Sequence, residues 1–365
     1  MKKIAVLGST GSIGRQALDV LSQMGEQYQI VALTANTNAV LLSLQQKKTG
    51  AEYAGLVSSG GKDCLVKALA DADVALIATG GIDSLDAVIY CLKNGKDILI
   101  ANKEVIVCAG ELIYKMLSSS QSKLYPLDSE HSAIWQCLDG KRADKLILTA
   151  SGGAFYDKTF EELKRVDIKT AFTHPRWDMG KSITLDSNTM FNKTLEVLEA
   201  RWLFNMPLED IEITVHRQSI VHSLVRFKDG CLLAQLSNPD MRLPISYALG
   251  YPSRVKNDYP PFDIAGNVKL TFEKVDGVRF PCVNLCYDQR CNSGLMPTVM
   301  VAANEALRVL FERGKVAFCD FYETILYVVE AFYPQLKDTR VTREGCFNTF
   351  ETAKKYTFNL FGENI

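Results

Sequence analysis

The N-terminal third of the chain alternates short apolar runs with helix-like segments, and this alternation sharply limits the folds it can adopt. Residues 4–7 form an apolar run that ends in a glycine turn, and a helix-like segment follows from Arg15 to Met24. Apolar runs return at 30–33, 74–79 and 97–102, again with helical periodicity between them. Apolar strands separated by helices predict a parallel sheet that is covered on both faces.

The pattern changes after residue 127. Four strand-like runs, KLILTA, IEITVH, SLVRFK and CLLAQL, lack a helix between each pair, which predicts an α+β domain with some antiparallel pairing at 128–250. Residues 251–281 are rich in Pro, Asp and Lys and are predicted to be a linker. Residues 282–365 are predicted to be a helical domain, in which Gly314 ends one helix. The expected fold is α/β, with a Rossmann-like doubly wound domain at 1–127, a central α+β catalytic domain and a C-terminal helical domain.

Composition and charge exclude several classes of protein. The 365 residues are 47% hydrophobic and 23% charged, with a net charge of -1. This balance is typical of a globular enzyme and predicts no nucleic-acid partner and no membrane association. No apolar run approaches ~20 residues, the length needed to span a bilayer. The chain opens directly into a strand and its ten cysteines form no CxxC pair, so we expect free thiols and a cytoplasmic location.

A glycine-rich turn follows the first apolar run. The letters GSTGSIG place Gly8, Gly11 and Gly14 between a predicted strand and a predicted helix. Glycines let the backbone approach a pyrophosphate, whose charge then meets the helix N-terminus. The spacing GxxGxxG is less specific than GxGxxG, and a tight turn without a ligand is the alternative.

The end of the second strand favours NADP over NAD. An NAD enzyme of this fold usually has an acid there to bind the ribose hydroxyls. The region reads LTANTNA, without an acid, so nothing repels a 2′-phosphate. It also lacks a Lys or Arg to pair with that phosphate, and Asn36, Thr37 and Asn38 offer only neutral hydrogen bonds.

Two carboxylates follow a probable strand near the start of the second domain. Asp128 and Glu130 lie one residue apart before the predicted helix HSAIWQCL. Hard oxygen ligands suit Mg²⁺ or Mn²⁺ better than zinc. Helix capping is the alternative function of such a pair.

A second group of polar residues occupies one face of a later predicted helix. In DSNTMFNKTLEVLEARWLF, Ser187 is predicted to be the N-cap, and Asn192 and Glu196 are four residues apart. Lys193 lies three residues before Glu196, so an amide, a cation and an acid share this face. An exposed Lys–Glu pair worth ~0.2–0.5 kcal/mol is the alternative.

Three further segments supply candidate site residues. Ser151, in ASGGAF after a strand, is placed for contact with an anion. THPRWDMGK carries His174 and Trp177 and is predicted to be a closing loop, although a turn histidine and a core aromatic are the alternatives. Lys103 follows a strand of the first domain and is expected to face the cofactor crevice, unless it is an exposed loop lysine. His216 and His222 are expected to be packed or to cap.

Several motifs, in order along about two-thirds of the chain, resemble the 1-deoxy-D-xylulose 5-phosphate reductoisomerase family of the non-mevalonate isoprenoid pathway. They are GSTGSIG, ANKE, DSEHSAIWQ, SGGAF, HPRWDMG, DSNTMFNKTLE and HRQSIVHS, and AANEAL extends the likeness into the C-terminal helices. The resemblance implies an NADPH- and metal-dependent enzyme that isomerises and reduces deoxyxylulose phosphate to 2-C-methyl-D-erythritol 4-phosphate. It also implies a homodimer.

The resemblance assigns roles to the candidate residues. Lys103, Glu130 and His174 would act in catalysis, and Asp128, Glu130 and Glu196 would hold Mn²⁺ or Mg²⁺, with Co²⁺ as a further candidate. The cofactor would contact Thr10, Gly11, Ser12, Ile13, Asn36, Thr37, Asn38, Asn102, Glu104 and Gly180. The phosphorylated sugar would contact Lys103, Ser129, Glu130, Ser151, His174, Trp177, Ser187, Asn192, Lys193 and Glu196.

The chain also departs from the family pattern. In the family pattern a Lys often stands at the position of Thr37 and helps to hold the 2′-phosphate, so the departure bears on discrimination between NADPH and NADH. Ala154 stands where Pro is usual, and Asn188 replaces a small residue. HPRWDMG carries charged Arg176 and Asp178.

Two rival functions remain open. The first is an NADP-linked semialdehyde or sugar dehydrogenase on the same scaffold, which need not require a metal. The second is a nucleotide-sensing relative without activity, which would be expected to have lost one of the three acids.

Overall fold

The computed structural model describes residues 1–172, 180–266 and 268–363, and contacts divide the chain into two compact units. Unit 1 comprises Met1–Ile106, Gly110–Trp135 and Asp240–Pro261, and unit 2 comprises Val107–Ala109, Gln136–Pro239 and Phe262–Ile365. The domain boundaries at 127, 250 and 281 stay predictions. Among the described residues, no helix is both long and apolar enough to cross a membrane.

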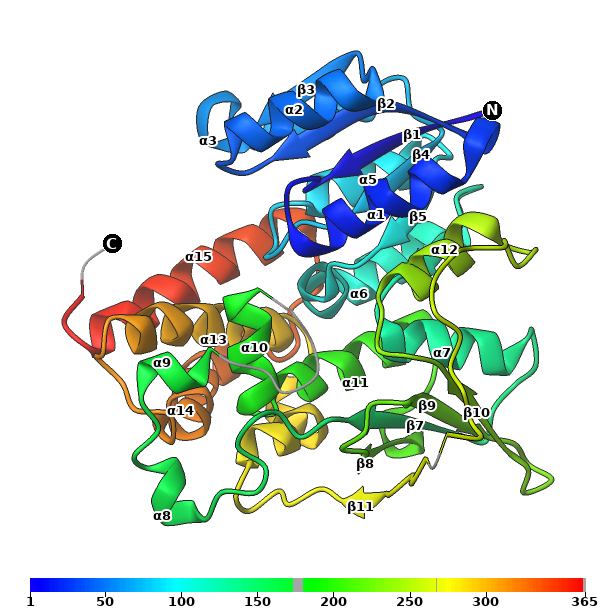
Figure 1. Cartoon of the computed structure of the whole chain (residues 1–365). Coiled ribbons are helices and arrows are strands. Elements are labelled where there is room, and N and C mark those ends of the chain that lie inside the picture. Colours follow the sequence, from blue (N-terminus) through cyan, green and yellow to red (C-terminus); the bar gives the residue numbers. More distant parts are fainter. Residues whose placement is uncertain (173–179, 267, 364–365) are drawn as a thin grey trace. The chain divides into compact units, whose positions relative to one another are not determined.

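Unit 1 is built on a six-stranded parallel sheet in the order β3-β2-β1-β4-β5-β6 (Figure 1). The strands are β1 (Lys2–Leu7), β2 (Tyr28–Ala35), β3 (Tyr53–Leu56), β4 (Val74–Ile77), β5 (Asp97–Ile100) and β6 (Leu124–Pro126). The helices are α1 (Ser12–Gln23), α2 (Ala39–Thr49), α3 (Val57–Gly60), α4 (Asp63–Lys67), α5 (Leu85–Lys93), α6 (Lys103–Ser118), α7 (Ser129–Leu138) and α12 (Arg242–Gly250), with a 3-10 turn at Gly25–Gln27.

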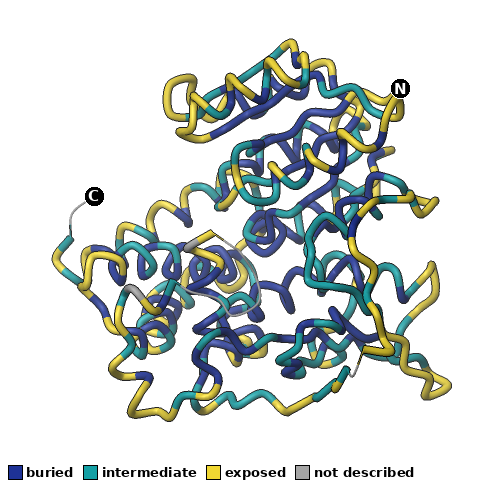
Figure 2. The backbone as a smooth tube through the Cα atoms, viewed as in Figure 1, coloured by how far each residue is buried: buried dark blue, intermediate teal, exposed yellow. Residues whose placement is uncertain are grey.

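The predicted doubly wound sheet is confirmed. Successive side chains of β1 point to opposite faces, yet all of Ile4–Leu7 are fully buried, so both faces of the sheet are covered (Figure 2). The chain leaves β1 for β2 on one side and later returns to place β4 on the other side. Ligands of such sheets bind at this reversal of strand order, beyond the carboxyl ends of the strands.

Helix α12 belongs to unit 1 although it lies far along the chain. The Tyr28 hydroxyl donates to Leu249 O at 2.8 Å, and an Arg242–Asp19 ion pair of 3.2 Å joins α12 to α1. Ile245, Ala248 and Leu249 are buried in the same core as β1 and α1. No local periodicity in the sequence shows this long-range return.

Unit 2 contains a five-stranded mixed sheet in the order β10-β9-β7-β8-β11. Strand β7 pairs parallel with β8 and antiparallel with β9, which confirms the expected α+β pairing. The strands are β7 (Lys145–Ala150), β8 (Ile211–Val215), β9 (Val221–Arg226), β10 (Leu232–Leu236) and β11 (Glu273–Lys274).

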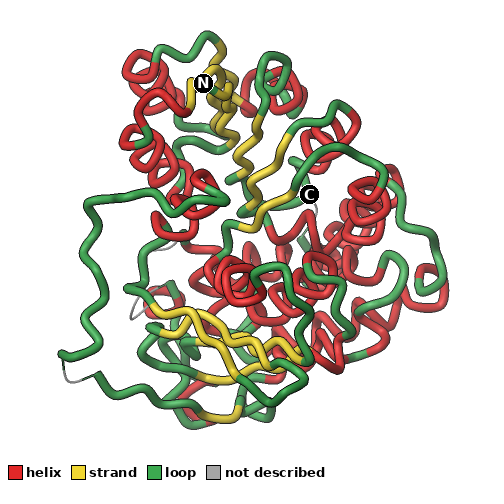
Figure 3. Tube along the Cα trace, turned by 90° about the vertical axis from the view of Figure 1, so that its right-hand side faces the viewer, coloured by secondary structure: helices red, strands yellow, loops and turns green. Residues whose placement is uncertain are grey.

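The rest of unit 2 is mainly helical, as the sequence predicted for the C-terminal part (Figure 3). Gly314, in the left-handed conformation at φ 70°, follows the end of α13 and donates to Phe311 O. The helices are α8 (Phe160–Leu163), α9 (Ile168–Ala171), α10 (Lys181–Asn188), α11 (Phe191–Leu203), α13 (Met296–Glu312), α14 (Asp320–Leu336) and α15 (Arg343–Leu360), with 3-10 turns at Leu208–Asp210, Pro281–Tyr287 and Gln289–Cys291.

Candidate active site

The glycine turn joins β1 to α1 at the carboxyl end of the parallel sheet. Gly8 has φ +85°, and its N–H and that of Ser9 donate to Thr34 O on β2 at 3.0 and 2.8 Å. A Cβ on Gly8 would lie 2.5 Å from Ala78 O, and one on Gly14 would lie 2.2 Å from Gly8 O. The close packing of turn, helix and strand therefore requires glycine at both positions.

A buried side chain that the sequence analysis missed supports this turn from α2. The Ser9 hydroxyl donates to Gln45 Oε1 at 2.7 Å, and Gln45 Nε2 donates back to Ser9 O at 2.8 Å. Thirty-six positions separate these residues, so no local pattern reveals the pair. Four residues of this glycine turn were predicted to contact the cofactor, and all four are at least partly exposed: Thr10, Gly11, Ser12 and Ile13.

Replacing Gly14 by Ala is expected to destabilise unit 1 and to weaken NADPH binding at least about tenfold. The added methyl group would collide with the backbone at Gly8, and overpacking of this kind costs about 1–3 kcal/mol. Thermal unfolding and a fluorescence titration with NADPH measure the two effects. Gly266→Ala is the matched control, since its Cβ would make only ordinary contacts at 3.6 Å or more. Unchanged NADPH affinity in Gly14→Ala would count against the turn as the phosphate site.

The residues predicted beside the cofactor's 2′-phosphate are all exposed at the end of β2. They are Asn36, Thr37 and Asn38. Asn38 has a second role, because its Oδ1 accepts from Leu41 N at 3.0 Å and caps α2. An Asn directly before a helical run was the sequence signal for this cap.

Asn102 is buried and holds two loops of unit 1 together. Its Oδ1 accepts from Val105 N at 2.9 Å and caps α6, while its Nδ2 donates to Gly81 O at 2.8 Å. Glu104 lies half-buried in the first turn of α6. These bonds make Asn102 a link between the two loops, and the cofactor roles of Asn102 and Glu104 stay predictions.

Unit 1 brings together one set of predicted catalytic and metal-binding residues. Lys103 Nζ lies 2.9 Å from Asp128 Oδ2, and His131 Nδ1 lies 3.4 Å from the same oxygen. Burial works to raise the pKa of the Asp128 carboxyl, but the Lys103 ammonium and the nearby His131 outweigh burial and hold this pKa well below its usual range. The Ser129 hydroxyl donates to Glu130 Oε2 at 2.6 Å. Both acids lie at the start of α7, which places two carboxylates near one helix end.

His131 was missed in the sequence analysis although it is fully buried beside this group. Its position three residues after Asp128, on a predicted helix, was the available signal. Asp128 Oδ1 accepts from Ser129 N, the first residue of α7, at 3.1 Å, and its Oδ2 faces Lys103. The capping alternative for Asp128 and Glu130 stays a prediction.

Unit 2 brings together a second set of predicted residues on α11. Lys193 is 5% exposed and Glu196 is 1% exposed, so the alternative of a surface ion pair is wrong. Lys193 Nζ donates to the Glu196 carboxylate and to Thr149 O at the end of β7, the latter at 2.6 Å. Asn192 Nδ2 donates to Glu196 Oε1. Two charges buried this deeply are costly to desolvate, so their burial is typical of a functional site.

The predicted N-cap at Ser187 is wrong. Residues Lys181–Asn188 already form α10, and Ser187 lies in its last turn. The break comes two residues after the end of α10, where Met190 adopts φ 63° and precedes α11 without a side-chain cap. The sequence DSNT resembles a cap signal, but the preceding residues also form a helix and move the start of α11 to Phe191.

The loop that carries Ser151 turns sharply at two left-handed glycines. Gly152 and Gly153 have φ +79° and +66°, and Gly153 N donates to Ser151 Oγ at 3.3 Å. Arg217 donates from one nitrogen to Ser151 O at 2.9 Å and to Gly153 O at 3.2 Å. Arg217 was not predicted from the sequence, although it lies in the motif HRQSIVHS.

The structure describes two of the histidines considered in the sequence analysis, but it does not describe most of the predicted closing loop. His216 is fully buried, its Nδ1 donates to Thr271 O at 2.8 Å and its Nε2 accepts from Ile220 N at 3.2 Å, which confirms a packed structural histidine. His222 Nε2 lies 3.3 Å from Ser237 O. His174 and Trp177 lie outside the described residues, and Gly180 is the exposed N-cap of α10.

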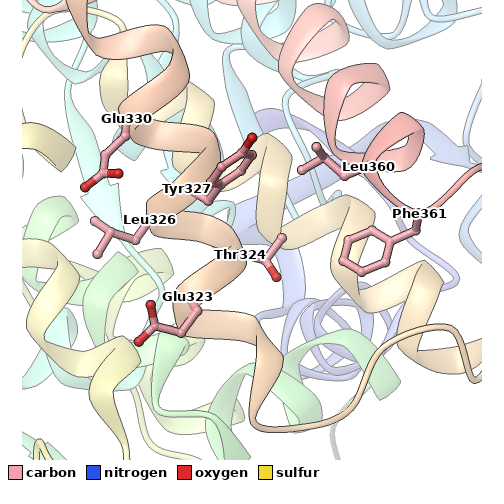
Figure 4. Close-up of a pocket in the computed structure, with 7 residues that line it drawn as sticks. All are labelled: Glu323, Thr324, Leu326, Tyr327, Glu330, Leu360 and Phe361. Carbon is pink, nitrogen blue, oxygen red and sulfur yellow. The ribbon is translucent and has the colours of Figure 1, made fainter.

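Unit 2 also has an open pocket of about 460 Å³ between α14 and the end of α15 (Figure 4). None of the predicted active-site residues that the structure describes lines it. The lining residues are Glu323, Thr324, Leu326, Tyr327, Glu330, Leu360 and Phe361.

Comparison with known proteins identifies the family. The model of 1-deoxy-D-xylulose 5-phosphate reductoisomerase matches residues 4–71 and 57–110, and models of its C-terminal domains match 124–204 and 236–356. The enzyme named 1-deoxy-D-xylulose 5-phosphate reductoisomerase 1 from Bacillus anthracis is 43% identical over 99% of this chain and 98% of its own length. The chain belongs to the 1-deoxy-D-xylulose 5-phosphate reductoisomerase family. The resemblance drawn from the motifs is thereby confirmed.

Solved reductoisomerase structures share the fold along the whole chain. The enzyme from Zymomonas mobilis, in complex with NADPH, is 34% identical, covers 99% of both chains and superposes with a TM-score of 0.89. A reductoisomerase in complex with NADPH, fosmidomycin and magnesium is 31% identical, with 99% of this chain and 98% of that chain covered and a TM-score of 0.88. The α/β fold with a Rossmann-like domain and a helical C-terminal region is confirmed.

Proposed function

We propose that the protein isomerises 1-deoxy-D-xylulose 5-phosphate and reduces the product with NADPH to 2-C-methyl-D-erythritol 4-phosphate, a step in isoprenoid precursor biosynthesis. The observation that carries this proposal is the buried Lys193–Glu196 pair of α11, in a chain that matches reductoisomerases over 99% of its length. A cation and an acid at one buried position suit a substrate that carries both a phosphate and metal-binding oxygens.

We infer that Asp128, Glu130 and Glu196 hold one divalent cation. Each offers a carboxylate oxygen, and three carboxylates are the hard donor set that Mg²⁺ and Mn²⁺ prefer. Relatives of known structure contain magnesium, and Mn²⁺ and Co²⁺ are the further candidates. A cation there would stabilise negative charge that develops on the substrate oxygens during rearrangement. Lys103, beside Asp128, is placed to hold a substrate oxygen and to move a proton.

Lys193 supplies the cation for the substrate phosphate in this proposal, and Ser151, Ser187 and Asn192 supply neutral hydrogen bonds. Phosphate binding away from the reacting carbons positions those carbons and improves the rate through orientation. His174 and Trp177 are proposed to complete the substrate site. Ser129 and Glu130 face the oxygenated carbons in the same proposal.

NADPH is proposed to bind across the glycine turn, with its pyrophosphate at the N-terminus of α1. The exposed backbone at Gly11 and the partly exposed Thr10, Ser12 and Ile13 support this placement. The cofactor supplies the hydride, and the protein aligns it with the substrate carbon.

Replacing Thr37 by Lys is expected to lower the KM for NADPH up to about fivefold without changing the KM for NADH. The added ammonium would meet the 2′-phosphate at an exposed position, where an ion pair contributes about 0.2–1 kcal/mol. Steady-state assays with both cofactors measure the effect. Gln121→Lys, which adds the same charge in the exposed loop before β6, should change neither value. Equal gains for NADH and NADPH would contradict a 2′-phosphate contact at residue 37.

Oxidation of NADPH in the presence of deoxyxylulose phosphate, with and without a chelator, tests the proposed function. We expect turnover that is lost on chelation and restored by Mn²⁺ or Mg²⁺, with methylerythritol phosphate as the product. Metal-independent turnover of another sugar or a semialdehyde would instead indicate a dehydrogenase.

We further propose a homodimer in the cytoplasm. Among the described strands, β10 lies at the edge of its sheet beside β9. Its Leu232 and Leu233 are 49% and 41% exposed, so a second copy would cover both an open edge and apolar side chains. The ten free cysteines suit a reducing compartment. Sedimentation should give twice the chain mass for the wild type and a monomer for Leu233→Lys; a wild-type monomer would contradict the dimer.

A further inference from the structure

The side chain of Asn188 joins two segments that carry predicted phosphate ligands. Asn188 is the last residue of α10, follows Ser187 and is fully buried. Its Oδ1 accepts from Ala154 N, in the loop after Ser151, at 2.6 Å. Its Nδ2 donates to Ala171 O, at the end of α9, at 2.9 Å. Both ends of this amide therefore bind backbone from other parts of unit 2.

The loop and the end of α10 are packed tightly against each other at this point. A Cβ on Gly153 would lie 2.6 Å from Asn188 Oδ1 and 2.9 Å from Ser187 O. Gly153 also has φ +66°, which favours glycine. The backbone at Gly153 thus packs against the end of α10 with no room for a side chain between them, and a shift of either segment would displace the other.

Helix α10 is itself anchored, so it provides a fixed reference for the loop. Asp186 is buried, and its two carboxylate oxygens accept from Asn304 Nδ2 at 2.9 Å and from an Arg308 nitrogen at 2.8 Å, both on α13. On the other side of the loop, Arg217 fixes the carbonyls of Ser151 and Gly153. The loop N–H at Ala154 is held by Asn188.

We propose that Asn188 is a positioning residue that sets the geometry of Ser151 relative to Ser187, and thereby the affinity for the substrate phosphate. This inference rests on the proposed phosphate site. Its essential contact is the Ala154 N–H to Asn188 Oδ1 hydrogen bond. The bond depends on the residues at both positions, since Pro at 154 would have no N–H and a short aliphatic side chain at 188 would have no amide oxygen.

A double-mutant cycle on Ala154 and Asn188 tests the proposal. Asn188→Ala leaves the Ala154 N–H without its acceptor, and Ala154→Pro leaves Asn188 Oδ1 without its donor. Each single variant is expected to raise the KM for deoxyxylulose phosphate about tenfold, with kcat within about threefold of the wild type. The double variant lacks the same bond as each single variant, so its KM is expected to stay about tenfold above the wild type instead of rising about 100-fold.

A control variant removes an amide that lies away from this contact. Asn292→Ala removes an amide that donates to Cys286 O elsewhere in unit 2, and it should leave KM unchanged. If Asn188→Ala does not fold, Asn188→Leu, of similar volume, replaces it in the cycle.

The outcomes distinguish this inference from the proposed function. Single variants with wild-type KM, or effects that simply add in the double variant, would overturn the role of Asn188 while leaving the enzyme's activity established. If the wild type does not turn over deoxyxylulose phosphate, the proposed function fails, and the cycle is then read from the dissociation constant of inorganic phosphate measured by calorimetry. A tenfold loss of phosphate affinity in each single variant, with no further loss in the double variant, supports the inference; equal affinity throughout, or no phosphate binding by the wild type, refutes it.

Discussion

Glu196→Gln is expected to lower the turnover of deoxyxylulose phosphate at least about 100-fold while leaving the fold and NADPH binding largely intact. The change removes one of three anionic ligands, and a cation in such a site contributes several kcal/mol to the stabilisation of developing charge. At about 1.4 kcal/mol per factor of ten in rate, the loss of about 3 kcal/mol gives this effect. The amide retains an oxygen that can accept from Lys193, so the local packing of α11 is preserved.

Steady-state kinetics, NADPH titration and thermal unfolding of the same preparation check this expectation. Glu305→Gln is the matched control, because Glu305 is also an ion-paired glutamate on a helix of unit 2, with Lys354 as its partner. The control should keep wild-type turnover. Near-normal activity of Glu196→Gln would remove Glu196 from the metal site.

Lys193→Ala is expected to raise the KM for deoxyxylulose phosphate about 10- to 100-fold. A hydrogen bond to a charged group contributes about 1.5–3 kcal/mol, and Lys193 provides the buried ammonium for the phosphate. The variant also leaves Glu196 without its cationic neighbour, so a smaller loss of kcat should accompany the rise in KM.

A comparison with unphosphorylated deoxyxylulose isolates the phosphate contribution to this effect. The ratio of kcat/KM between the phosphorylated and unphosphorylated sugars should fall in Lys193→Ala and stay unchanged in Lys354→Ala, which removes a lysine paired with Glu305. An unchanged ratio in Lys193→Ala would show that Lys193 acts on the metal ligand alone.

Local sequence patterns predict the two sheets and the helical end of the chain because each depends on short-range periodicity. The runs at 74–79 and 97–102 become β4 and β5, and their burial on both faces follows from their apolar composition. The polar face of α11 was also predictable, since Asn192 and Glu196 are four residues apart. Its burial was not predictable, because it depends on β7. Lys193 donates to Thr149 O at the end of this strand, 44 positions away along the chain.

Contacts between distant segments explain what the sequence did not reveal. Ala154 and Asn188 are 34 positions apart, so their hydrogen bond has no local signature. The support of the glycine turn by Gln45 and the return of α12 to unit 1 depend equally on tertiary packing. The wrong N-cap prediction at Ser187 has a different cause. The letters DSNT match a capping signal, but the residues before them also form a helix, and α10 continues past Ser187 to Asn188.

Binding of Mn²⁺ to the metal-free protein, measured by electron paramagnetic resonance, tests most directly whether the three acids share one ion. We predict one tight site in the wild type and a loss of affinity of at least about tenfold in each of Asp128→Asn, Glu130→Gln and Glu196→Gln, with Glu305→Gln unchanged. Wild-type Mn²⁺ affinity in Glu196→Gln, together with its loss in Asp128→Asn and Glu130→Gln, would contradict a single cation held by all three carboxylates.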